Sequence, residues 1–265
     1  MQPGFFRTLS TRLLQPCKSA VRHPSLIGPV LRGTEIGSVL KQHLAIHLQE
    51  PMTNTLEPSP DLINFTCQAI DAHSHACFRL GYLYDLCLRM RPEKVVETGV
   101  HHGVSTAFIL NALKQTGGRL YSIDLPNVKY QTDNQSRQDD VLLGAEPGFL
   151  VPQHLRVNWE LLIGDSRQLL PTLLRSIGPI DIFHHDSMHT YEHMKFEFEA
   201  VWPHLRDGGL LLSDDVDWSR AFEDFCSARK LNYRIRKGVG IAPKNIRHSS
   251  SYSKGSLTES RNKGS

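Results

Sequence analysis

Apolar and polar residues alternate along the middle of the chain with two different periods. Short apolar runs typical of buried strands occur at 94–100, 119–125, 159–165, 180–186 and 208–215. Segments with helical spacing separate most of these runs, at 105–115, 166–176 and 188–205. Strands that alternate with helices predict a parallel sheet with right-handed crossovers and helices on both faces.

The pattern of apolar residues also predicts helices before these strands and a hairpin after them. Apolar residues at helical spacing over 61–90 predict one or two helices that cover the sheet edge or the ligand pocket. His73 and His75 in this stretch are expected to be polar surface residues. Near the other end, two strand-like runs flank Gly238 and indicate a terminal hairpin. The predicted fold is therefore α/β: a Rossmann-like, mostly parallel seven-stranded sheet with helices on both faces, N-terminal helices and a terminal antiparallel hairpin.

Composition divides the chain into three parts. We expect a basic N-terminal extension at 1–50, one domain at 51–243 and a disordered tail at 244–265 rich in Ser, Lys and Arg. Within the domain, 126–158 is too long for a simple strand-to-helix connection, and we interpret it as a substrate-binding loop.

The N-terminal extension is unusual in charge. Residues 1–34 contain no Asp or Glu, and Phe6, Leu9 and Leu13 recur at helical spacing among five basic residues. The favoured interpretation is an extension that packs on its own domain. Weak contact with an anionic membrane surface and an organelle transit peptide are the alternatives.

Charge and cysteine content exclude several other classes. The net charge of +3 is concentrated at the chain ends, so no nucleic-acid partner is expected. Five cysteines without a C-x-x-C pair indicate reduced structural thiols, and no apolar run reaches the roughly 18 residues of a membrane span. We expect a soluble cytoplasmic protein; self-association stays open.

The segment 94–106, KVVETGVHHGVST, is the centre of the candidate chemistry. It predicts a strand ending in Glu97, a loop with Gly99 and Gly103, and a helix start. Such a loop presents unpaired backbone N–H groups that suit a nucleotide-like or zwitterionic ligand. The fingerprint G-x-G-x-x-G of nicotinamide dinucleotide sites is not met, because its second and third places hold His101 and Val104. An ordinary strand–helix turn is the alternative.

Acidic residues end the other predicted parallel strands, at Asp124, Asp165, Asp186, Asp214 and Asp215. In parallel sheets ligands bind beyond these carboxyl ends. Each acid alone is compatible with a helix N-cap, but like charges gathered at one edge require a ligand or cation. Asp124 is placed to accept both hydroxyls of a ribose, Asp165 with Ser166 to contact an adenine edge, and Ser105 to bind a carboxylate.

Five segments in this order, ETGVHHGVST, YSID, GDSRQLLP, HHDSMHTYE and PHLRDGGLLLSDDV, resemble class I S-adenosylmethionine-dependent methyltransferases. The similarity extends over roughly 90–220. It is strongest to metal-dependent macrolide and sugar O-methyltransferases and cephalosporin-hydroxylase-like proteins, and more distant to catechol O-methyltransferase.

The resemblance implies a role for each candidate residue. The cofactor S-adenosylmethionine would be bound by Glu97, Gly99, Gly103, Ser105, Asp124, Asp165 and Ser166. Mg²⁺ or a similar divalent ion would be bound by Asp186, Asp214 and Asp215, and His189 would be the general base beside Asp186. The expected reaction is transfer of a methyl group to a hydroxyl of a sugar, glycan or other polyhydroxylated small molecule.

Two alternative functions remain. His184 and Asp186 form the H-x-D part of a two-histidine, one-carboxylate iron site of an oxygenase or hydroxylase. A non-catalytic protein that binds a cofactor or metal would use the same pocket without turnover.

Overall fold

The computed structural model of the chain describes residues 44–45, 48, 61–73, 79–126 and 146–244. The predictions for nearly all of the N-terminal extension, for most of the 126–158 loop, for the tail beyond Lys244 and for His75 lie outside the described residues.

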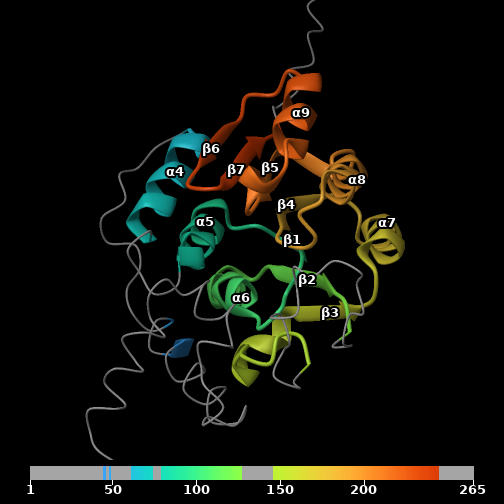
Figure 1. Cartoon of the computed structure of the whole chain (residues 1–265). Helices are drawn as coiled ribbons and strands as arrows, with labels where there is room; N and C mark the ends of the chain where they lie inside the picture. The colour runs from blue at the N-terminus through green and yellow to red at the C-terminus, as the bar shows by residue number, and fades with distance from the viewer. Residues whose placement is uncertain (1–43, 46–47, 49–60, 74–78, 127–145, 245–265) are drawn as a thin grey trace, which may run out of the picture.

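The described residues form one seven-stranded sheet (Figure 1). Its strands are β1 (Lys94–Thr98), β2 (Arg119–Asp124), β3 (Trp159–Ile163), β4 (Ile180–His185), β5 (Leu205–Ser213), β6 (Arg234–Arg236) and β7 (Val239–Pro243), in the order β3-β2-β1-β4-β5-β7-β6. The first five are parallel, while β7 runs antiparallel to β5 and β6 antiparallel to β7. The predicted sheet and terminal hairpin are confirmed.

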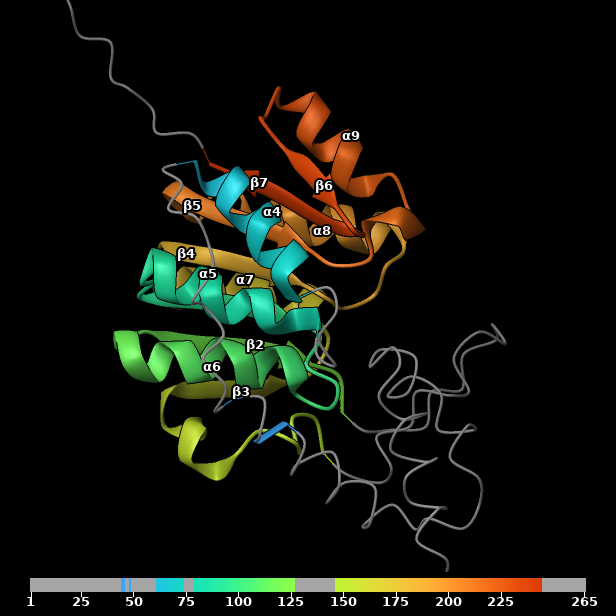
Figure 2. The same cartoon turned by 90° about the vertical axis from the view of Figure 1, so that its left-hand side faces the viewer.

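Helices of the described residues cover both faces of the sheet, as Figures 1 and 2 show. One face carries α4 (Leu62–His73), α5 (Tyr82–Met90) and α6 (Val104–Thr116), and the other α7 (Ser166–Ile177), α8 (Tyr191–Val201) and α9 (Ala221–Ala228). The short 3₁₀ helices of the described residues are η2 (Arg79–Gly81), η4 (Gln153–Asn158) and η5 (Val216–Trp218).

Burial of both faces explains the apolar strand runs. Val95 packs into the core under α4–α6, whereas its neighbour Val96 packs under α7–α9, and both are fully buried. Every residue of β4 is buried in the same way. Parallel strands covered on both faces are continuously hydrophobic for this reason.

One expectation for the helical stretch was wrong. His73 is buried at the end of α4, where its Nε2 lies 2.7 Å from Asp85 Oδ2 on α5. It was expected at the surface because the spacing of polar residues within one helix does not reveal which face a second helix will cover. The pair ties α4 to α5.

The strand order places the direction change of the sheet at β1. The chain runs outward through β2 and β3 on one side of β1 and through β4 and β5 on the other. The loops that leave β1 and β4 therefore diverge at their carboxyl ends, where open α/β sheets bind ligands.

Two further expectations can be compared with the described part of the chain. No helix there is long and apolar enough to cross a bilayer. Its three cysteines, Cys67, Cys87 and Cys226, are free thiols.

Candidate functional site

Gly99 brings the β1–α6 loop into contact with the end of β4. Its φ is +85°, and a Cβ at this position would lie 2.1 Å from the backbone oxygen of Asp186. The adjacent strands are joined there by the Asp186 N–H, which donates to Thr98 O at 2.8 Å. Only glycine satisfies both the left-handed backbone and the close approach.

Gly103 makes a second close approach on the outer side of the loop. Its φ is +90°, and a Cβ would lie 2.6 Å from Val151 Cγ2. The N–H of Gly148 donates to His101 O, and that of Leu150 to His102 O. Residues 148–151 therefore cover the glycine loop and fix its shape.

His102 is one of the two histidines in the β1–α6 loop. It is buried, and its ring lies edge-on to Phe149 with centroids 5.4 Å apart. Burial lowers the pKa of His102 to about 2, so the imidazole is neutral at physiological pH. His102 is thus a core residue that anchors the loop.

Glu97 lies directly beneath the loop. Its fully buried carboxylate accepts hydrogen bonds from Ser105 Oγ at 2.6 Å, Thr106 Oγ1 at 2.7 Å and Ser122 Oγ at 2.9 Å. These bonds tie the end of β1 to the first turn of α6 and to β2. Glu97 and the Ser105 hydroxyl, both predicted to contact the cofactor, are therefore engaged with each other inside the protein.

Asp124 closes the loop from the end of β2. Its Oδ2 accepts the N–H groups of Val100 at 3.0 Å and His101 at 2.6 Å, and its Oδ1 accepts that of Leu125 at 2.7 Å. Burial raises the pKa of Asp124, and these backbone hydrogen bonds oppose the shift. The structure thus brings together Asp124 and the glycine loop, as the sequence predicted.

Asp165 and Ser166 have local partners. Asp165 is the N-cap of α7, where its Oδ1 accepts the N–H of Arg167 at 2.8 Å. The hydroxyl of Ser166 is buried, 3.1 Å from His193 Nε2. Helix capping, the alternative raised for each strand-end acid, accounts for Asp165. Contact of either residue with an adenine stays a prediction.

Asp186, His189 and Asp215 form a group suited to a metal ion. One ligand atom from each lies within 4.8 Å of the other two, and His189 Nε2 is 3.8 Å from Asp186 Oδ1. The two carboxylates supply the oxygen ligands that suit a divalent ion such as Mg²⁺ or Mn²⁺. Of the three predicted metal ligands, Asp186 and Asp215 thus lie together, and the predicted base His189 is their neighbour.

Asp214 is not part of this group within the described residues. It is fully buried, and its Oδ1 accepts the Asp215 N–H at 3.0 Å and lies 3.3 Å from an Arg79 guanidinium nitrogen. The same nitrogen is 3.2 Å from Asp215 Oδ1. Arg79 was not predicted, because it lies 135 positions before Asp214 and no local pattern marks it.

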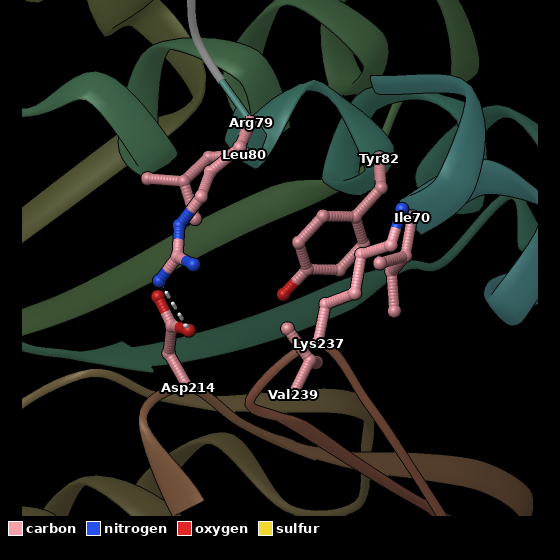
Figure 3. A pocket seen from close by; sticks show the side chains of 7 residues that line it. All are labelled: Ile70, Arg79, Leu80, Tyr82, Asp214, Lys237 and Val239. Carbon is pink, nitrogen blue, oxygen red and sulfur yellow. Dashed lines mark hydrogen bonds and ion pairs between the residues drawn. The ribbon is translucent and has the colours of Figure 1, made fainter. Parts of the chain in front are cut away.

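A cavity of about 100 Å³ adjoins Asp214 (Figure 3). It is lined by Ile70, Arg79, Leu80, Tyr82, Asp214, Lys237 and Val239. The Tyr82 hydroxyl points into it and has no hydrogen-bond partner among the described residues. Burial, and secondarily the charge of Asp214, raises the pKa of Tyr82, so the phenol remains a protonated donor.

The geometry does not gather the residues of the alternative iron site. His184 is buried with its Nδ1 3.7 Å from Glu97 Oε1, under the glycine loop. Within the described ranges, the group around Asp186 that can hold a metal contains one histidine, His189.

Comparisons with known proteins agree with this arrangement. Residues 96–216 match the family model described as a methyltransferase domain. The demethylmacrocin O-methyltransferase of Streptomyces fradiae is 35% identical over 66 residues, which is 24% of this chain and 16% of that protein. The mycinamicin VI 2''-O-methyltransferase of Micromonospora griseorubida is 33% identical over 61 residues, 23% of this chain and 15% of that protein. Each match thus spans less than a fifth of the curated relative.

A solved structure extends the similarity of fold. The O-methyltransferase NovP superposes with a TM-score of 0.50 at 17% sequence identity, covering 81% of this chain and 100% of that one. Residues 96–216 of this chain therefore match a methyltransferase-domain model, and the sheet built around them has the fold of the O-methyltransferase NovP.

Proposed function

We propose that the protein is an S-adenosylmethionine-dependent O-methyltransferase assisted by a divalent ion. The observation that carries this proposal is the contact between Gly99 and the backbone of Asp186. It joins the loop suited to the cofactor to the residues suited to the metal. A methyl donor and an ionised hydroxyl can therefore meet at the β1–β4 edge.

The cofactor would bind over the glycine loop. Gly99 and Gly103 leave the loop without side chains, and the N-terminus of α6 adds a partial positive charge that favours the methionine carboxylate. Asp124 would lie near the ribose. Its carboxylate already orders the N–H groups of Val100 and His101, so it keeps the loop in shape before the cofactor arrives. S-adenosylmethionine supplies a methyl group that its sulfonium already activates.

The acids across the edge prepare the acceptor. Asp186 and Asp215 would hold Mg²⁺ or a similar ion, whose charge lowers the pKa of a neighbouring hydroxyl. His189 would take the proton from that hydroxyl, and the nearness of its imidazole to both acids supports this role. Orientation of the hydroxyl toward the methyl group provides the remaining acceleration.

The rim of the site indicates what class of acceptor enters. Trp218 is 63% exposed although it is large and aromatic, and its ring centroid lies 5.7 Å from that of His189. Met188, which precedes His189 in the chain, is also exposed. Such a surface suits the apolar face of a ring. This supports a sugar or other polyhydroxylated ring as the acceptor, and the two curated relatives are by name O-methyltransferases of demethylmacrocin and mycinamicin VI.

Calorimetry with S-adenosylmethionine, NAD and 2-oxoglutarate tests the cofactor class. Binding of S-adenosylmethionine alone is expected, whereas binding of only one of the other two would refute the proposal. Labelled S-adenosylmethionine with Mg²⁺ and a panel of polyhydroxylated acceptors then identifies the substrate. Asp215→Ala should abolish turnover and spare cofactor binding. The exposed neighbour Asp217→Ala is the matched control.

A further inference from the structure

A buried carboxylate that is not part of the candidate metal site lies on the inner face of α8. Glu197 is fully buried, although its neighbours on this face, Met194, Phe198 and Val201, are apolar core residues. An apolar side chain would fill this position without the cost of burying a charge. The presence of a carboxylate therefore calls for a specific role.

Four side chains donate hydrogen bonds to Glu197. They are Thr98 Oγ1 at 2.6 Å, His185 Nδ1 at 2.7 Å, His193 Nε2 at 2.9 Å and Ser187 Oγ at 3.1 Å. Thr98 ends β1, His193 is on α8 itself, and the other two belong to the end of β4 and the loop that follows it.

The two donors from β4 and its loop stand on either side of a metal-site residue. His185 directly precedes Asp186, and Ser187 directly follows it. Their bonds to Glu197 therefore hold the chain both before and after Asp186. Because the side chain of a residue follows its backbone, this double attachment restricts where the Asp186 carboxylate can point.

The same network reaches the candidate base. The ring of His185 packs edge-on against the ring of His189, with centroids 5.2 Å apart. Glu197 fixes His185, and His185 supports one side of His189. Asp186 and His189, which the loop between β4 and α8 contributes to the metal-capable group, are thus both supported by one buried carboxylate.

The charge state of Glu197 agrees with this geometry. Burial by itself would raise the pKa of its carboxyl group, but hydrogen bonds from His185 and His193 outweigh burial and lower the pKa. Glu197 is therefore ionised and can accept all four donors at once.

We propose that Glu197 is a positioning residue that holds Asp186 and His189 in place for a divalent ion. This inference depends on the metal part of the proposed function. It adds that the arrangement of the metal site is set from α8, by a residue that does not touch the ion. Groups that orient metal ligands in this way affect metal affinity by about 10–100-fold when removed.

Binding of Mn²⁺ to the full chain, followed by electron paramagnetic resonance, tests the inference without any acceptor. Glu197→Gln keeps the size of the side chain but opposes an amide N–H to donors that need an acceptor. We expect its Kd for Mn²⁺ to rise about 10–100-fold, with unchanged affinity for S-adenosylhomocysteine. Glu199→Gln is the control, because Glu199 lies on the same helix and pairs with Arg229 away from the site. Equal Mn²⁺ affinity in folded Glu197→Gln and Glu199→Gln would overturn the inference.

A second pair of variants decides the matter if Glu197→Gln does not fold. Ser187→Ala removes a bond to the loop that carries Asp186, whereas Thr98→Val removes a bond of the same carboxylate to β1. Weaker Mn²⁺ binding in Ser187→Ala alone supports positioning of the loop, and equal effects in both overturn it. If the unaltered chain binds S-adenosylhomocysteine but no Mn²⁺, this inference fails while the methyltransferase proposal stands. If it binds Mn²⁺ but no S-adenosylhomocysteine, the methyltransferase proposal fails.

Discussion

Replacement of Gly99 by alanine is the most direct test of the contact between the glycine loop and β4. The new methyl group would lie 2.1 Å from Asp186 O and 2.5 Å from Asp186 C. Both atoms are backbone atoms of a strand end, so no side-chain rotation relieves the overlap. The variant must therefore move the loop away from Asp186.

The expected cost has two parts. A left-handed backbone costs a residue other than glycine about 1–2 kcal/mol, and overpacking in a closely packed interior costs about 1–3 kcal/mol. Together they predict a loss of about 2–5 kcal/mol in the free energy of unfolding for Gly99→Ala. This is a large share of the roughly 5–15 kcal/mol that stabilises a typical domain.

Gly117→Ala separates the two parts. Gly117 ends α6 with φ +89°, nearly the same as Gly99, but a Cβ there would meet no atom within 4 Å. Urea unfolding should therefore show about 1–2 kcal/mol for Gly117→Ala and clearly more for Gly99→Ala. Calorimetry should show weaker S-adenosylmethionine binding only for Gly99→Ala. Equal destabilisation by the two variants would refute the claim that the β1–α6 loop contacts the backbone of Asp186 at Gly99.

Three further predictions concern Tyr82, Glu197 and Arg79. Tyr82→Phe should leave the stability against urea unchanged or raise it by up to about 1 kcal/mol, because it removes a buried hydroxyl that has no partner among the described residues. Tyr84→Phe is the control on the same helix; it removes the hydrogen bond that Gln115 donates and should lower the stability slightly. Because the pKa of Glu197 is lowered on folding, its contribution to stability is complete at pH values well above the ordinary 4.5 and is lost as the pH falls toward the lower folded value. Glu197→Gln should therefore lose less stability against urea than the unaltered protein between neutral and acidic pH. An equal loss in both proteins would contradict this account. Arg79→Met should tighten Mn²⁺ binding about tenfold, since it removes a unit charge beside Asp215; unchanged affinity would show that the guanidinium does not act on the site.

The sequence determined the local framework of this protein. Strand runs such as 94–98 and 180–185 are recognisable by apolar residues such as Val95, Val96 and Phe183, which burial on both faces of the sheet favours. Gly99 and Gly103 mark the loop because only glycine combines positive φ with a close backbone approach. The acids at the strand ends were placed at one edge by parallel topology alone, and Asp186 and Asp215 do meet there.

The tertiary structure decided where the side chains point. Asp165 caps α7 and Asp214 turns toward Arg79, although both stand at strand ends like Asp186. Glu197 could not be recognised, because its role depends on His185 and Ser187, which precede α8 and meet the carboxylate only when this helix packs on the sheet. Strand and helix periods are local properties of the chain, whereas these partners are chosen only when the register of the sheet and the packing of its helices bring distant residues together.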